Sequence, residues 1–435
     1  MKRLLISLLC ATNTTAVLAQ SIQLSLNNPT GVYQIGETIA ITAEIADGDS
    51  LSDGERIITL RTFQNNQETT TQRTVRLHDE QIPIYETSLD HPGSIMVEAS
   101  LGDAKDTIGA IVGPEQLQPG LDRPADFETF WEREKAQLAT LPLDASLSPI
   151  QLPDSQIDLV AYDVEIPTPG PRPARAIFAK PARAEPKSLP IVLNLHAAGV
   201  KGDWCRAHLD EATSLARRGS GALAFDLNAH GMLNHEDESY YEALESGPLE
   251  AYWTQGIEDR NEYYFRFMYL RLLRSIEFLA RQPEWDGKRI LVIGESQGGG
   301  QALAASGLDS RVTAVVATVP AMCDFGGPLA KRKGGWPQPL DERPDNAQVQ
   351  NAVAYFDIAS ILPDSHATLV VEVGLIDQAC PSTSIFAAIN QAKGEKNILS
   401  VPYRAHPWPE QADRERHWDE HVLAKKEAFI DAFLK

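Results

Sequence analysis

Two patterns of hydrophobic and polar positions divide the chain. Between residue 20 and about residue 113, apolar residues alternate with polar ones, as in the stretches 39–45 and 95–99. Such alternation is typical of strands that are buried on one face only. Threonine is frequent, and turn residues such as His91-Pro92-Gly93 separate the alternating stretches. The pattern predicts an immunoglobulin-like β-sandwich domain over residues 20–113.

After a linker at residues 114–124, short apolar runs are separated by helical stretches. Asp126 is expected to cap the first of these helices, at the start of a catalytic domain over residues 125–435. Near-uniform apolar strands are expected where helices cover both faces of a sheet. The pattern therefore predicts an α/β fold with a doubly wound, mostly parallel sheet. The expected strands cover residues 190–196, 222–226, 289–294, 312–319 and 368–374.

Length and charge narrow the function. The chain has 435 residues, which suits two or three domains at roughly 150 residues each. Its 39 lysines and arginines face 60 aspartates and glutamates, for a formal net charge of -21. Nucleic acids and anionic membranes need a cationic surface, so neither is the expected partner. The acidity also favours a neutral substrate over uronate or sulfated glycans.

The first 19 residues have the features of a secretory signal. Lys2 and Arg3 precede an apolar run, and small residues end it at 17–19. The run is too short, and too interrupted by polar residues, to cross a bilayer. Leu9 before Cys10 is a poor context for lipoprotein cleavage. We predict a signal peptide over residues 1–19, no membrane anchor, and a secreted or periplasmic protein.

Cysteine usage does not indicate metal or redox chemistry. Cys205, Cys323 and Cys380 remain after the signal, and this odd number allows at most one intramolecular bridge. None of them has C-x-x-C spacing, and isolated cysteines are commonly small buried hydrophobes. We predict no metal and no organic cofactor.

The sharpest motif is the G-x-S-x-G sequence at residues 294–298. It lies between the apolar strand predicted at 289–294 and a helical run. In a nucleophile elbow, a strained turn between strand and helix lifts a serine hydroxyl above the carboxyl end of the sheet, and flanking glycines make room for it. This context predicts that Ser296 is a nucleophile.

A serine nucleophile of this kind needs an acid and then a base further along the chain. Asp377 follows the strand predicted at 368–374, whereas Asp364 precedes that strand and lies at the wrong end. His406 follows a short apolar run and is the expected base. The rival candidates, His417 and His421, lie four residues apart near the start of a C-terminal helix, where a solvated helix face is expected.

Acyl transfer also needs backbone N–H groups that bind the oxyanion. Gln297, directly after the nucleophile, is expected to supply one. The loop at residues 197–199, after the first long strand, is expected to supply the other. His196 precedes this loop and would break the chain order of a triad, so we interpret it as a structural loop residue.

Four stretches together resemble carbohydrate esterase family seven, the acetyl xylan esterase and cephalosporin C deacetylase group of α/β-hydrolases. The resemblance runs from about Arg123 to the end of the chain, and it implies the triad Ser296, Asp377 and His406. The stretches are PADFETFW, YYFRFMYLRLLRSIEFL, RILVIGESQGGGQALAASGLDSRVTAVVATVPAMCDF and GLIDQACPSTSIFAAIN.

The chain departs from the family pattern in three loops. Where the family has a tyrosine after the first strand, Ala198 is left to supply the oxyanion N–H. The family's Arg-Gly-Gln-Gly is replaced by residues 228–231, so Asn228 and His230 become candidate pocket residues, with His230 either a substrate contact or a loop hydrogen-bonder. Pro407 replaces a common glutamate.

The family's hexamer implies a homo-oligomer, whose contacts the added sandwich would block or replace.

These observations predict an exported serine carboxylesterase that deacetylates a small or oligomeric carbohydrate through an acyl-enzyme. One alternative is a peptidase of the prolyl oligopeptidase type, although about 95 sandwich residues cannot form the large propeller of those enzymes. The other is a glycan-binding protein with a degenerate hydrolase domain. For the sandwich itself, a spacer or assembly role is favoured over sugar binding, because it lacks a clear aromatic platform.

Overall fold

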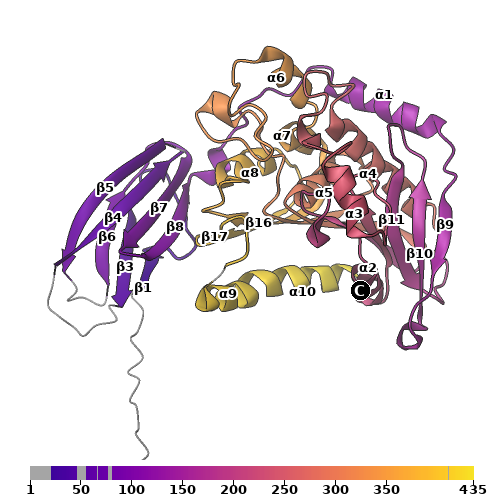
Figure 1. The fold of residues 1–435 in the computed structure, drawn as a ribbon, viewed down its shortest axis with the longest axis horizontal. Helices are drawn as coiled ribbons and strands as arrows, with labels where there is room; N and C mark the ends of the chain where they lie inside the picture. Colours follow the sequence, from indigo (N-terminus) through magenta and orange to yellow (C-terminus); the bar gives the residue numbers. More distant parts are fainter. Residues whose placement is uncertain (1–20, 47–54, 66, 77–80, 410) are drawn as a thin grey trace, which may run out of the picture.

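A computed structural model describes residues 21–46, 55–65, 67–76, 81–409 and 411–435 (Figure 1). The predicted signal peptide lies outside these residues. Within the described ranges, no helix combines the length and the apolar character needed to cross a bilayer. The N-terminal strands form two small sheets at one end of the molecule, and a large sheet flanked by helices makes up the rest.

The N-terminal region consists of two facing sheets with a shared core. Period-two alternation produces this core: Ile39, Ile41 and Ala43 are buried and point to the same face, as do alternate residues of β7. One sheet has the order β1-β3-β6, and the other β2-β8-β7-β4-β5. The strands are β1 Ser21–Leu26, β2 Val32–Tyr33, β3 Ile39–Ala46, β4 Glu55–Gln64, β5 Gln67–Arg76, β6 Ile82–Thr87, β7 Gly93–Leu101 and β8 Ala104–Val112.

The large sheet has nine strands in the order β17-β16-β15-β14-β12-β13-β11-β10-β9. The six strands from β17 to β13 are parallel, and β11, β10 and β9 continue the sheet antiparallel. All the expected strands are present. The bounds are β9 Ser146–Ile150, β10 Leu159–Ile166, β11 Ala174–Pro181, β12 Leu189–Leu195, β13 Leu223–Asn228, β14 Trp285–Glu295, β15 Ala314–Thr318, β16 Thr368–Gly374 and β17 Lys396–Val401.

Helices cover both faces of this sheet, which explains its near-uniform apolar strands. In β12, Ile191 and Leu193 pack into the core beneath α1, α4, α5, α7 and α8, whereas Val192 packs toward α2 and α10. The prediction of a doubly wound α/β fold is therefore confirmed. The helices are α1 Phe127–Thr140, α2 Leu209–Arg217, α3 Glu238–Glu245, α4 Tyr264–Ala280, α5 Gln297–Leu308, α6 Ala347–Val353, α7 Ile358–Ile361, α8 Ser382–Ile389, α9 Ala412–Trp418 and α10 Ala424–Phe433.

Asp126 immediately precedes α1 but does not cap it through its side chain, contrary to the prediction. Its carboxylate instead accepts hydrogen bonds from Arg260, at 2.8 Å, and from the hydroxyl of Tyr355. A charged guanidinium is a stronger partner for a carboxylate than a backbone amide, so the side chain is drawn away from the helix end.

The N-terminal sheets pack against loops at the carboxyl ends of β16 and β17. The Gly109 amide of β8 donates to the Pro402 carbonyl at 2.8 Å, and Arg414 of α9 contacts both carboxylate oxygens of Asp106 at 2.6 Å. Gly109 has no room for a side chain, because a Cβ there would lie 2.2 Å from the Leu375 carbonyl oxygen. The two loops are therefore held in part by the N-terminal region.

Candidate active site

Ser296 is the single residue between the end of β14 and the start of α5. Its backbone angles are φ 51° and ψ -117°, a conformation that a non-glycine residue adopts only under strain. The glycines of the motif permit this turn. A Cβ on Gly294 would lie 2.3 Å from the backbone of Gly298, and a Cβ on Gly298 would lie 2.3 Å from the carbonyl oxygen of Leu195. The motif thus has the geometry of a nucleophile elbow.

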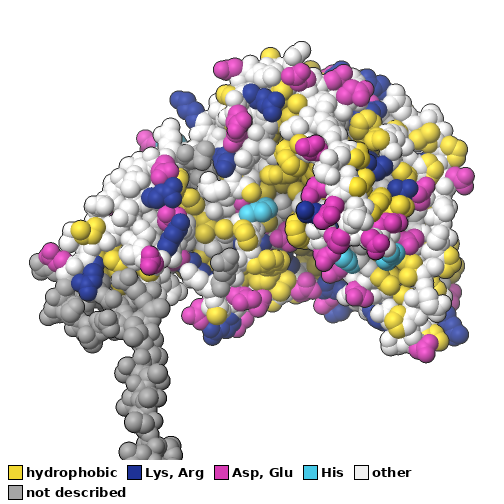
Figure 2. All heavy atoms as spheres, in the orientation of Figure 1, with side chains coloured by type: hydrophobic (Ala, Val, Ile, Leu, Met, Phe, Trp, Pro, Cys, Tyr) yellow, Lys and Arg dark blue, Asp and Glu magenta, His cyan; other side chains and the backbone are white. Residues whose placement is uncertain are grey.

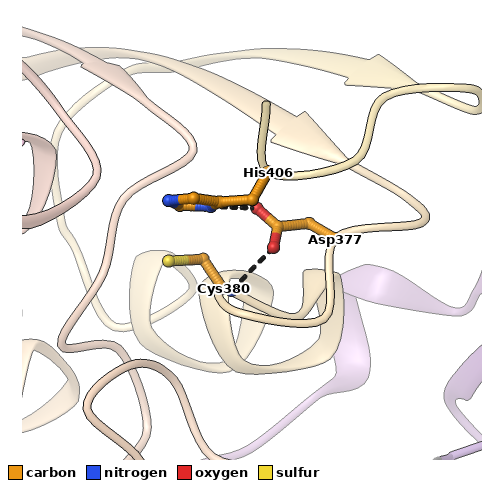
Figure 3. Close-up of side chains that lie close together, drawn as sticks. All are labelled: Asp377, Cys380 and His406. Carbon is orange, nitrogen blue, oxygen red and sulfur yellow. Dashed lines mark hydrogen bonds and ion pairs between the residues drawn. The ribbon is translucent and has the colours of Figure 1, made fainter. Parts of the chain in front are cut away.

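The structure brings the three predicted triad residues together. His406 Nε2 lies 3.0 Å from Ser296 Oγ, and His406 Nδ1 lies 2.8 Å from Asp377 Oδ2. Because a carboxylate only accepts, Nδ1 carries the proton, and Nε2 accepts the hydrogen bond from the serine hydroxyl. The other oxygen of Asp377 accepts 2.8 Å hydrogen bonds from the amides of Ala379 and Cys380 (Figure 3).

Opposing effects set the protonation of His406. Burial has the largest single effect and lowers its pKa, but the hydrogen bond and charge of Asp377, together with the charge of Glu295, outweigh it. The pKa of His406 is therefore raised above its usual 6.5. An imidazole whose protonated form is stabilised in this way is suited to accept a proton from a neighbouring hydroxyl.

The two segments expected to bind an oxyanion flank Ser296. Gln297 is the first residue of α5, so its amide has no acceptor within the helix. Its side chain is held away by a 2.6 Å hydrogen bond from the Tyr252 hydroxyl. Ala197 and Ala198 line the same cavity as Ser296, and the Ala198 carbonyl accepts a 3.1 Å hydrogen bond from the Trp204 indole.

His230 and Asn228 do not line the cavity, contrary to their tentative assignment to the pocket. Both are only 1% exposed. His230 Nε2 donates to the Gly199 carbonyl at 3.0 Å, and its Nδ1 accepts from the Tyr264 hydroxyl at 2.8 Å. Burial and then the charges of Arg271 and Arg172 lower the pKa of His230 to about 3, which keeps it neutral. His230 is thus the loop hydrogen-bonder of the two interpretations.

Asn228 also fixes a loop. Its side-chain oxygen accepts from the Ala207 amide at 3.0 Å, and its side-chain nitrogen donates to the Met232 carbonyl at 3.2 Å and to Asn234. Both polar atoms of the Asn228 side-chain amide are therefore engaged in hydrogen bonds within the protein. Asn228 and His230 are absent from the cavity wall because the short loop turns their polar side chains inward, where buried backbone groups need hydrogen-bond partners.

The rival acid and bases have other partners and do not contact the triad. His196 Nε2 contacts Asp226 at 2.6 Å, as expected of a structural residue, although its ring also lines the cavity. His417 contacts the Tyr403 hydroxyl and packs against the tilted ring of His421, with ring centroids 4.5 Å apart. Asp364 forms an ion pair with Arg123.

A cavity of about 1040 Å³ opens over Ser296 and His406. Its walls contain three tryptophans that sequence reasoning missed: Trp204, Trp336 and Trp408. The sequence could have indicated two of them, because Trp204 and Trp408 lie in loops that follow the carboxyl ends of strands, where α/β folds place their ligand-binding sites. On the face shown in Figure 2, hydrophobic side chains gather in the hollow between the N-terminal sheets and the large region, and acidic ones gather over α2 and α3.

Asp377, Cys380 and His406 are the one group of potential metal ligands that lie close together among the described residues (Figure 3). The donor set does not suit a metal. Burial and the charge of Asp377 raise the pKa of the Cys380 thiol well above its ordinary value, whereas metals bind the thiolate. Asp377 and His406 are also bonded to each other. Cys205, Cys323 and Cys380 are buried, as predicted, and none of the three forms the one bridge that their number allowed.

The fold is that of an α/β-hydrolase, and the turn at Ser296 has the geometry of a nucleophile elbow. The family model described as acetyl xylan esterase (AXE1) matches residues 115–421, and the chain belongs to this family.

Similar proteins agree with this assignment. Acetyl esterase Axe7A of Xylanibacter ruminicola is 30% identical to this chain over 299 residues, which are 67% of this chain. The match covers 66% of Axe7A, so the chain spans slightly less than two thirds of the length of that protein. An acetyl xylan esterase from Paenibacillus sp. R4 has a TM-score of 0.60 at 25% identity, over 74% of this chain and 98% of that one. Acetyl xylan esterase 1 from Thermoanaerobacterium sp. JW/SL YS485 shares the fold, with a TM-score of 0.55 at 21% identity and the same coverage.

Proposed function

We propose that this protein is an exported serine carboxylesterase that removes acetyl groups from carbohydrate hydroxyls. The observation that carries the proposal is the unbroken chain of hydrogen bonds from Asp377 through His406 to Ser296, in a member of the acetyl xylan esterase family. This arrangement matches what a serine acyl-transfer mechanism requires.

In the proposed reaction, Ser296 Oγ attacks the ester carbonyl while His406 Nε2 takes the hydroxyl proton. His406 then gives that proton to the departing sugar oxygen, which leaves an acetyl group on Ser296. Water attacks this acyl-enzyme with His406 again as base, and acetate and the free serine form. Asp377 keeps the proton on Nδ1 and stabilises the imidazolium.

The amides of Gln297 and Ala198 are the proposed donors to the oxyanion. Two observations support them. Gln297 begins a helix, whose N-terminus favours negative charge. The Ala198 loop is fixed from behind, since Gly199 is bonded to the buried His230 and the Ala198 carbonyl to Trp204. Preorganised donors of this kind contribute on the order of 100- to 1000-fold in rate each.

Export, the division into domains and a neutral sugar substrate are also part of this proposal. Export through residues 1–19 concerns a segment outside the described residues. The division into domains at 20–113 and 125–435, with a linker at 114–124, is supported by a separate hydrophobic core in the N-terminal sheets. The charge of the cavity walls supports a neutral sugar over an anionic one. Among the described residues, the lining includes Asp203, Glu211 and Glu295 but no lysine or arginine.

Histidine substitutions test the proposal. With p-nitrophenyl acetate as substrate, His406→Ala should lower kcat by about 10⁴-fold or more, whereas His417→Ala should retain activity. A fluorophosphonate should label the unmodified protein at Ser296 and leave Ser296→Ala unlabelled. Turnover by His406→Ala at the level of the unmodified protein, or labelling at another serine, would contradict the triad.

A further inference from the structure

Two large indole rings are exposed on the walls of the cavity that holds Ser296. Trp204 is 68% exposed and Trp408 is 50% exposed. A large apolar side chain that stays exposed in a concave site indicates a surface for a ligand, because folding alone would bury it. Trp408 is closely tied to the proposed catalytic base, because it follows His406 by two residues in the same loop.

The position of Trp408 follows from its buried neighbours. The guanidinium of Arg404 lies 4.6 Å from the centre of the Trp408 ring. The Trp418 ring meets Trp408 edge to face, with centroids 4.5 Å apart. Arg404 is itself fully buried and forms a 3.0 Å ion pair with Glu372. The indole is therefore held in place before any ligand binds, which reduces the entropy lost on binding.

The chemistry at His406 defines what lies beside this ring. During acyl transfer, the leaving oxygen of the ester must come within hydrogen-bond distance of His406 Nε2. In a carbohydrate ester this oxygen is attached directly to a sugar ring, so the ring must lie near the loop that carries His406. Trp408 belongs to that loop and lines the same cavity.

We infer that Trp408 is a binding residue for the sugar ring on the leaving-group side of the ester, and that it makes the enzyme prefer acetylated pyranosides to simple acetates. This inference rests on the proposed function. The flat indole face suits the C–H groups on one face of a neutral pyranose. The acidic groups along the walls disfavour an anionic sugar, and the volume of about 1040 Å³ exceeds what an acetyl group alone needs.

Two substrates separate this role from a structural one. Trp408→Ala should lower kcat/KM for acetylated xylo-oligosaccharides by about 5- to 10-fold, mainly through KM, and leave ethyl acetate, whose leaving group carries no ring, within about twofold. Trp408→Phe should restore most of the loss. Ile157→Ala is the matched control, since Ile157 is an exposed apolar residue (83%) that does not line this cavity, and it should change neither substrate. Equal losses on both substrates, or no loss on the oligosaccharide, would overturn the inference.

A binding measurement distinguishes failure of this inference from failure of the proposed function. In a Ser296→Ala background, calorimetry with acetylated xylo-oligosaccharides should show binding that Trp408→Ala weakens by a similar factor. If the unmodified protein hydrolyses no ester but this binding depends on Trp408, the proposed function fails and the sugar-binding role of Trp408 stands. If esters are hydrolysed and oligosaccharide binding does not depend on Trp408, the inference fails alone.

Discussion

At the scale of single residues, the charges around His406 decide at which pH it is neutral and able to serve as the proposed base. Burial lowers its pKa, and Asp377 and Glu295 together raise it to a net value above 6.5. The imidazole must be neutral to accept the serine proton, so kcat/KM should rise with pH and level off only above this raised pKa.

Glu295 offers a test that leaves the triad intact. Glu295→Gln removes a negative charge that stabilises the imidazolium, and it removes one of the two carboxylates paired with Arg404, whose positive charge lowers the pKa of His406. Both changes lower that pKa. The acid limb of the kcat/KM profile for p-nitrophenyl acetate should therefore shift to lower pH. An unchanged limb, or a shift to higher pH, would contradict this account of the histidine.

The meeting of Ser296, Asp377 and His406 was predictable because each follows the carboxyl end of a strand, and these ends share one edge of the sheet. The placement of His230 and Asn228 was not. Whether a polar loop residue faces the cavity or the protein depends on which backbone groups behind it lack partners, and these are defined only by the fold.

At the scale of elements, the elbow depends on close approach of α5 to β12. Gly298 sits where a Cβ would lie 2.3 Å from the backbone carbonyl of Leu195. Gly298→Ala should destabilise the protein by about 1–3 kcal/mol and lower kcat, because the helix must shift and carry Ser296 with it.

Thermal unfolding and p-nitrophenyl acetate hydrolysis measure these two effects. Gly287→Asn is the control: Gly287 has a positive φ but open space around it, and asparagine tolerates that conformation. The control should lose little stability and no activity. A Gly298→Ala variant with the stability and kcat of the unmodified protein would show that the elbow does not require this packing.

The strands of the large sheet were predictable to different degrees. The five predicted strands are buried and apolar, so composition alone revealed them. Strands β9, β10 and β11 were not singled out, because they form the antiparallel end of the sheet, where β9 is largely exposed and carries polar residues. Asp126 shows the same limit for helix ends, since its long-range partners Arg260 and Tyr355 replaced the local cap.

At the scale of the whole molecule, a buried ion pair joins the N-terminal sheets to α9. Asp106 is 4% exposed and Arg414 is 9% exposed, and Asp106 also accepts a 2.7 Å hydrogen bond from the Leu24 amide. Arg414→Met leaves the Asp106 charge buried without its partner, which should cost about 3–5 kcal/mol of stability. Thermal unfolding measures this loss.

The same helix supplies the control. Arg416 pairs with Asp413 at the surface, so Arg416→Met should change stability by less than about 1 kcal/mol. Equal effects of the two substitutions would show that the contact between the regions does not contribute to folding. No sequence pattern revealed the Asp106–Arg414 pair, because its partners are 308 residues apart and only the packed fold brings them together.

Acetate release from acetylated xylo-oligosaccharides at pH 7 tests the proposed attack of Ser296 on acetyl esters of carbohydrates. The unmodified protein should release acetate, and Ser296→Ala should release it at least about 10⁴-fold more slowly while still folding. Acetate release by Ser296→Ala at the rate of the unmodified protein, or none by the unmodified protein itself, would contradict the account.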